Sequence, residues 1–206
     1  MTLGQVDSAV PKPSVLYPLR TVVERLNLGE LFPKQQPLEV ELCAGDGSFI
    51  LAMARLHPER NFIAVERLLG RARKIGRKGG RAGLANLRAV RLEGSYFLKY
   101  LLPPASAEVL HIYFPDPWPK RRHWERRLIN AEFTGIAAQV LAPGGKVFIR
   151  TDDASYYAQI QAVFGANAKF EPTQMPEDLN ALLTDFEQEF TAKGVETLRA
   201  SYRVRI

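Results

Sequence analysis

Short apolar runs alternate along most of the chain with longer stretches whose apolar residues recur at helical spacing. Runs of this kind, typical of strands buried on both faces, occupy residues 38–43, 62–66, 87–92, 109–114 and 146–151. The helical spacing predicts helices from 48 to 56, along the basic stretch that closes near 80, and over 128–141, 154–164 and 177–190, with shorter strands at 168–171 and 197–206. This alternation predicts an α/β fold, a doubly wound and mostly parallel sheet with helices on both faces.

The first 37 residues do not follow that alternation. Residues 1–13 read as a flexible lead. Residues 15–32 place apolar side chains at helical spacing, which predicts a helix, and the prolines between 33 and 37 predict a loop. We therefore expect a lead and helix over residues 1–37 and one domain over residues 38–206.

Composition and charge favour an anionic partner. The 206 residues are 46% hydrophobic, enough for one sizeable core, and the net charge is +6. A basic surface that is merely solvated would give the same net charge. The cations are concentrated within residues 67–81 and 120–127, however, and two basic blocks beside strand ends favour a surface that contacts phosphates.

Several classes of protein are excluded. Cys43 is the only cysteine, so there is no disulfide framework or cysteine zinc site, and the three histidines lack metal-ligand spacing. We expect no metal. The start of the chain has no apolar core of the kind a signal peptide needs, and no apolar run is long enough to span a bilayer. A soluble cytoplasmic protein with no membrane partner is the default expectation.

The first strand leads into a glycine turn that is typical of a ligand loop. Gly45 and Gly47 follow the strand, and a helix begins directly after them. The dinucleotide pattern of three glycines is not met, because Cys43 occupies the first position and the third glycine is absent. Glu41 would repel a diphosphate but attract a cationic ligand such as S-adenosylmethionine. An ordinary strand-to-helix turn remains the alternative.

The next two strand ends also carry candidate cofactor residues. Glu66 ends the second strand, where an acidic residue in Rossmann-type sites accepts hydrogen bonds from ribose hydroxyls, although a solvated glutamate is a common alternative. Ser95 follows the third strand, near the usual place of adenine recognition, and offers only a hydroxyl.

The most specific stretch follows the fourth strand, at residues 114–127. Prolines on both sides of Asp116 stop the strand and expose this carboxylate at its carboxyl end, where open α/β sheets bind ligands. A basic run follows, so the segment suits an anionic polymer with aromatic bases. Trp118 and Trp124 could each stack on a base or belong to the core. Asp152 could cap a helix or join the site, and residues 184–187 could be a polar helix face.

Together these residues closely resemble the bacterial tRNA (guanine-N7-)-methyltransferase family over about residues 38–206. The matching motifs are Glu41-x-x-x-Gly45-x-Gly47, Glu66, the Phe-Pro-Asp-Pro-Trp-Pro-Lys-Arg-Arg-His run of 114–123, Arg126-Arg127-Leu128, Thr151-Asp152 and Thr184-Asp185-Phe186-Glu187. The resemblance implies a seven-stranded class I methyltransferase fold, S-adenosylmethionine as donor and a guanine of the tRNA variable loop as acceptor. It also implies work as one polypeptide, a monomer or homodimer without an obligatory second subunit.

The resemblance also implies residue roles. Asp116 would be the catalytic-site residue and contact the cofactor, whose other contacts would be Glu41, Gly45, Gly47, Glu66 and Ser95. The substrate contacts would be Lys120, Arg121, Arg122, His123, Asp152, Thr184 and Glu187. Two positions depart from the family: Cys43 replaces a usual glycine, and Ser95 a common aspartate. A methyltransferase for another RNA base or a small molecule, or a non-catalytic RNA-binding scaffold, are the alternatives.

Overall fold

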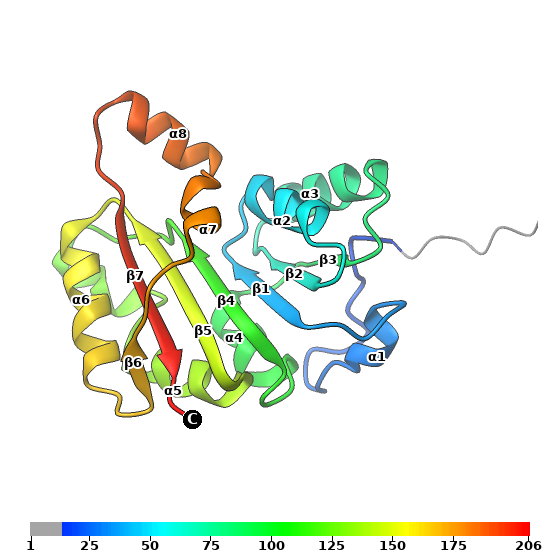
Figure 1. The fold of residues 1–206 in the computed structure, drawn as a ribbon, viewed down its shortest axis with the longest axis horizontal. Coiled ribbons are helices and arrows are strands. Elements are labelled where there is room, and N and C mark those ends of the chain that lie inside the picture. The colour runs from blue at the N-terminus through cyan, green and yellow to red at the C-terminus, as the bar shows by residue number, and fades with distance from the viewer. Residues whose placement is uncertain (1–13) are drawn as a thin grey trace, which may run out of the picture.

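Seven strands form one sheet in the computed structural model, which describes residues 14–206; the expected lead over residues 1–13 lies outside them. The strand order is β3-β2-β1-β4-β5-β7-β6 (Figure 1). The strands span Leu38–Leu42 (β1), Asn61–Val65 (β2), Leu87–Val90 (β3), Ala107–Tyr113 (β4), Leu141–Thr151 (β5), Phe170–Pro172 (β6) and Leu198–Val204 (β7). Only β7 runs against its neighbours β5 and β6. The predicted mostly parallel sheet is confirmed, including the reversed strand at the end.

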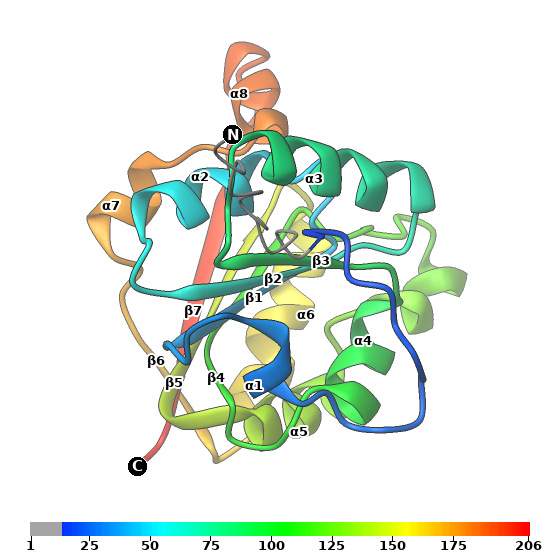
Figure 2. The same ribbon diagram turned by 90° about the vertical axis from the view of Figure 1, so that its right-hand side faces the viewer.

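Helices cover both faces of this sheet (Figure 2). They span Leu28–Leu31 (α1), Ser48–Leu56 (α2), Leu69–Arg81 (α3), Gly94–Tyr96 (α4), Ala131–Val140 (α5), Ala154–Gly165 (α6), Glu177–Ala181 (α7) and Asp185–Ala192 (α8), with a π-helix at Phe97–Leu101 and a 3-10 helix at Arg121–Arg126. One core cluster joins the sheet to α1, α5, α6 and the π-helix, and a second joins it to α2, α3 and α7. Neighbouring side chains along a strand pack in different clusters: Ile63 of β2 belongs to the first and Ala64 to the second.

The helix predicted over residues 15–32 is wrong. Only Leu28–Leu31 is helical, and at the start of the segment residues 15–17 are extended alongside β3. The Tyr17 amide donates to the Ala89 carbonyl at 2.9 Å, and the Ala89 amide donates to the Val15 carbonyl at 2.7 Å. Pro18 explains the failure of the periodicity, because proline lacks the amide that a helix interior needs.

Two further boundaries differ from the sequence prediction. The helix expected over 177–190 is divided into α7 and α8, because the chain is extended at Leu182 and Thr184. The proline and glycines at 143–145, predicted to end the preceding helix, lie within β5, whose pairing with β4 shifts register near this point.

The carboxyl ends of the parallel strands meet at one edge of the sheet, as parallel pairing requires. In Figure 1 this edge is at the top, with α2 and α3 near one half of it and α7 and α8 above the other. None of the helices within residues 14–206 has the combination of length and apolar character that crossing a membrane requires.

Candidate active site

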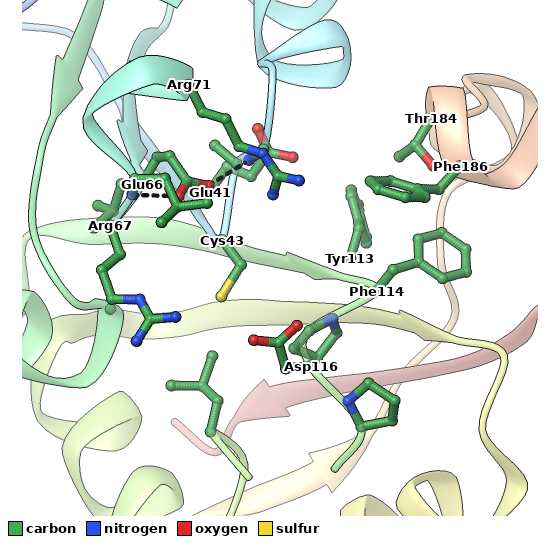
Figure 3. Close-up of a pocket in the computed structure, with 18 of the residues that line it drawn as sticks. Glu41, Cys43, Glu66, Arg67, Arg71, Tyr113, Phe114, Asp116, Thr184 and Phe186 are labelled. Atoms are coloured by element: carbon green, nitrogen blue, oxygen red, sulfur yellow. Dashed lines mark hydrogen bonds between the residues drawn. The ribbon is translucent and has the colours of Figure 1, made fainter. Parts of the chain in front are cut away.

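A cavity of about 690 Å³ opens at this edge of the sheet. Its walls come from the segments that follow β1, β2, β3, β4 and β5, and from α8. Of the residues to which the sequence analysis assigned a cofactor or substrate contact, the ones that line it are Glu41, Gly45, Glu66, Ser95, Asp116, Asp152 and Thr184. The structure therefore brings the three acidic residues from the first, second and fourth strands into one cavity, with Arg67 and Arg71 at its side (Figure 3).

Glu66 ties the glycine loop to the start of the next helix. Its Oε2 accepts a hydrogen bond from the Gly45 amide at 2.9 Å, and its Oε1 accepts one from the Leu68 amide at 2.7 Å. A carboxylate has about four acceptor sites, so this one keeps capacity for hydroxyl donors. Its position after β2 and its buried, fixed orientation suit it to hold a ribose.

Glu41 is buried without a full set of partners. It is 4% exposed, and within the described residues its Oε2 has no hydrogen-bond donor. Burial raises the pKa of its carboxyl group well above the ordinary value, and the charges of Asp46 and Glu66 add to this effect. A buried carboxylate that lines a cavity and lacks a donor fits a cationic ligand, which would supply the missing partner.

The glycine loop owes its shape to three residues with positive φ: Cys43 at 58°, Gly45 at 59° and Gly47 at 80°. Gly47 does not line the cavity. A Cβ atom there would lie 2.6 Å from Cγ1 of Ile75, so this glycine permits α2 and α3 to pack closely. The Cys43 side chain is exposed and its thiol points into the cavity (Figure 3), where the surrounding walls limit solvation and, with the neighbouring carboxylates, raise its pKa to about 12.

Asp116 is exposed and lines the cavity between two prolines, as predicted. Its neighbours on either side of those prolines, Phe114 and Trp118, have φ values of 51° and 45°. Such values are unusual for bulky residues and are found where surrounding structure fixes the backbone. The loop after β4 thus holds Asp116 at a defined place.

The fifth strand end resolves an alternative left open by the sequence. Asp153 is the residue that caps α6, since its side chain accepts a hydrogen bond from the Tyr156 amide at 2.7 Å. Asp152 is exposed and lines the cavity.

Several of the predicted site residues lie outside the cavity wall. Lys120, Arg121, Arg122 and His123 lie at the start of the 3-10 helix, mostly exposed, while the nearby Arg126 and Arg127 do line the cavity. Trp118 also lines it, and Trp124 instead packs against the Arg127 guanidinium, 4.5 Å from its ring centroid.

Glu187 is placed inside the protein. It is 1% exposed and forms ion pairs with Arg150, at 2.7 Å, and with Arg199. The Thr184 hydroxyl accepts a hydrogen bond from the Glu187 amide at 3.1 Å, so Thr184 caps α8. Arg150 also donates to the carbonyls of Leu179 and Leu182, which fastens α7 and α8 to the sheet. Contact of Glu187 with a substrate stays a prediction. Its observed ion pairs with Arg150 and Arg199 hold α8 against the sheet.

The sequence prediction missed the aromatic part of the cavity wall, formed by Phe114, Phe186 and Phe190. Cys43, one of the two departures from the family pattern, lines the cavity, as the resemblance implied. The available signal for Phe186 was its position inside a Thr-x-x-Glu capping motif, which fixes a residue between two anchored neighbours.

Comparison with known proteins agrees with this geometry. Residues 35–200 match the family model described as "Putative methyltransferase". A tRNA (guanine-N(7)-)-methyltransferase of Halorhodospira halophila is 32% identical, with all of this chain and 91% of that protein covered. The enzyme of the same name from Streptomyces avermitilis is 36% identical over 94% of this chain and 68% of its own length. The solved structure of the 16S rRNA methyltransferase KamB has a TM-score of 0.66 at 17% identity, covering 89% of this chain and 95% of KamB.

The sheet order and the single reversed strand are those of the class I, S-adenosylmethionine-dependent methyltransferase fold, and the family model identifies the chain as a methyltransferase. The length and the sequence identity of the matches to known enzymes narrow this class to one family. The chain belongs to the tRNA (guanine-N7-)-methyltransferase family.

Proposed function

We propose that this protein transfers the methyl group of S-adenosylmethionine to N7 of a guanine in the variable loop of tRNA, forming 7-methylguanosine. The observation that carries the proposal is the cavity that unites Glu41, Glu66 and Asp116 in a methyltransferase of this family.

The donor set at the glycine loop suits this cofactor. Glu41, whose Oε2 lacks a donor within the described residues, offers a partner to the cationic end of the molecule, and Glu66 offers acceptor sites to the ribose hydroxyls. Gly45 and Ser95 line the same cavity, whereas Gly47 acts by allowing the loop to close on α3. When bound, S-adenosylmethionine supplies a methyl group activated by its sulfonium.

The acceptor chemistry requires alignment more than proton transfer. Guanine N7 has an in-plane lone pair and bears no proton, so its methylation needs no obligatory general base. Alignment of the reacting atoms then provides most of the catalysis. Asp116 can accept from the N1–H and N2–H₂ donors that adenine lacks as a pair, which orients the ring, or it can stabilise the developing positive charge. We assign orientation as its main task; Asp152 and Thr184, also in the cavity wall, are candidates to hold other edges.

The exposed cations around the cavity suit the phosphates of tRNA. The exposed arginines of α3 (Arg71, Arg73, Arg77 and Arg81) and the exposed basic residues 120–122 lie outside the core. Lys74 and Lys78 of α3 pair with Asp46 at 3.1 and 2.9 Å, so part of their charge is balanced. Binding should weaken with salt with a log–log slope of about −0.7 to −0.9 per phosphate contacted.

The test is methylation of unmodified tRNA by the single purified chain with labelled donor, followed by nucleoside analysis. We expect 7-methylguanosine, and Asp116→Ala should lower turnover far more than cofactor affinity, with Asp116→Asn as the shape-matched comparison. Glu66→Ala should instead weaken cofactor binding by about 10- to 100-fold, the loss of hydrogen bonds to a charged group. If a different nucleoside carries the labelled methyl group, the proposed acceptor is wrong. No heat of binding on titration with S-adenosylmethionine would favour a non-catalytic scaffold.

A further inference from the structure

Three phenylalanine rings gather at one side of the cavity, and none of the roles assigned above uses them. Phe114 follows β4, while Phe186 and Phe190 are one turn apart on α8. The Phe114 centroid lies 6.5 Å from that of Phe186 and 5.6 Å from that of Phe190. Phe186 is 49% exposed, and Figure 3 shows its ring beside that of Phe114, across the view from Glu66 and Arg67.

The exposed ring is held at a fixed place. Phe186 lies between Thr184, whose side chain caps α8, and Glu187, whose carboxylate pairs with the buried Arg150. Phe114 lies between the buried residues Tyr113 and Pro115. Two rings anchored by buried neighbours yet open to a cavity are suited to a ligand rather than to the core, because an isolated apolar side chain would gain free energy by turning inward.

The surroundings of these rings select a class of ligand. Asp116, Asp152 and Asp185 line the cavity together with Arg67 and Arg71. An apolar face bordered by hydrogen-bonding groups matches a flat heteroaromatic ring with polar edges, and bases stack on aromatic side chains for this reason. We propose that Phe114 and Phe186 form a stacking surface for the acceptor purine and hold its N7-methylated, cationic form more tightly than the neutral base.

This inference rests on the proposed function and adds a contribution to catalysis. In the transfer, the N7 lone pair forms the new N–CH₃ bond, the S–CH₃ bond breaks, and its electron pair stays on sulfur. The sulfonium becomes a neutral thioether and the purine becomes a cation. Because aromatic faces attract cations, stacking strengthens as charge moves to the purine, and an interaction stronger in the transition state than in the ground state raises the rate.

Phe186→Leu tests the ring while keeping apolar bulk, and Phe186→Trp restores a ring. Stacking predicts that the leucine variant loses roughly 5- to 150-fold in kcat/KM for tRNA. The tryptophan variant should recover most of that loss. Affinity for S-adenosylmethionine and the salt slope of tRNA binding should stay unchanged, because neither depends on this ring. Tyr100→Leu is the matched control, since Tyr100 is 44% exposed on the π-helix and outside the cavity wall.

Titration with nucleosides tests the stacking inference independently of the proposed methylation of tRNA. At mildly acidic pH, where 7-methylguanosine keeps its positive charge, it should bind the wild-type protein roughly 2- to 30-fold more tightly than guanosine, and Phe186→Leu should remove this preference. If the wild type forms no 7-methylguanosine in tRNA yet shows the preference, the proposed function fails and the stacking surface stands. If the wild type methylates tRNA and Phe186→Leu matches it, or Phe186→Trp is no better than Phe186→Leu, the stacking inference is overturned.

Discussion

Replacement of Cys43 by glycine should stabilise this protein, although glycine usually has the opposite effect. The φ angle of Cys43 is 58°, in the left-handed region, where the Cβ atom of an L-residue crowds the following carbonyl. The thiol is directed into the cavity, so its loss removes little packing.

The magnitude follows from two opposing contributions. Steric strain raises the energy of a residue with a Cβ atom by about 1–2 kcal/mol in the left-handed conformation. Glycine avoids that strain but loses about 0.5–1 kcal/mol more conformational entropy on folding. Cys43→Gly should therefore raise the free energy of unfolding by about 0.5–1 kcal/mol, or the melting temperature by about 1–4 °C for a chain of this size.

The measurement is denaturant unfolding of three proteins: wild type, Cys43→Gly and Cys43→Ala. Alanine removes the thiol but keeps the Cβ atom, so it keeps the strain and should not exceed the wild type. With the thiol pKa near 12, all three carry the same charge at neutral pH. An alanine variant more stable than the glycine variant would show that the backbone at this position is not strained, and the reasoning would be wrong.

Four other substitutions give distinct outcomes. Gly47→Ala should cost about 2–4 kcal/mol of stability, because its Cβ would lie 2.6 Å from Ile75 at a φ of 80°, whereas Gly80→Ala, in open space on α3, should stabilise by up to about 1 kcal/mol. Glu187→Gln should cost about 3–5 kcal/mol by thermal unfolding, since it leaves a buried arginine unpaired. Glu41→Gln should gain stability over wild type as pH rises from 4.5 to the raised pKa, because in that range only the wild type must take up a proton on folding, while its affinity for S-adenosylmethionine falls. A constant stability difference across pH would contradict this.

The parts of the fold that the sequence predicted are those whose signal is local. The strands from 38 to 151 are short apolar runs, and such runs lead to buried parallel strands irrespective of their neighbours. Asp116 was predictable because its two prolines must end a strand, which places the side chain at the sheet edge. The prediction for 15–32 failed because Pro18 interrupts a helix there, and because residues 15–17 pair with Ala89 of β3 in an extended conformation, a tertiary contact that apolar spacing does not reveal.

The candidate site was predicted in its acidic residues and less well in its α8 wall. Thr184 and Glu187 were interpreted through the resemblance as substrate contacts, while the Thr-x-x-Glu pattern itself indicates a helix cap. That the Glu187 carboxylate also pairs with Arg150 and Arg199, from β5 and β7, could not be deduced from sequence, because those strands pair only in the folded sheet. The position of Phe186 over the cavity depends on the same pairing.

The loop after β4 carries a consequence for how an RNA could reach this site. Prolines at 115, 117 and 119 fix every second φ angle, and each also restricts the residue before it, so the segment has few shapes to choose from. Such a loop does not change its conformation when an RNA binds. A nucleotide that binds in this cavity must therefore flip out of its base stack, and the RNA rather than the protein must change shape on binding.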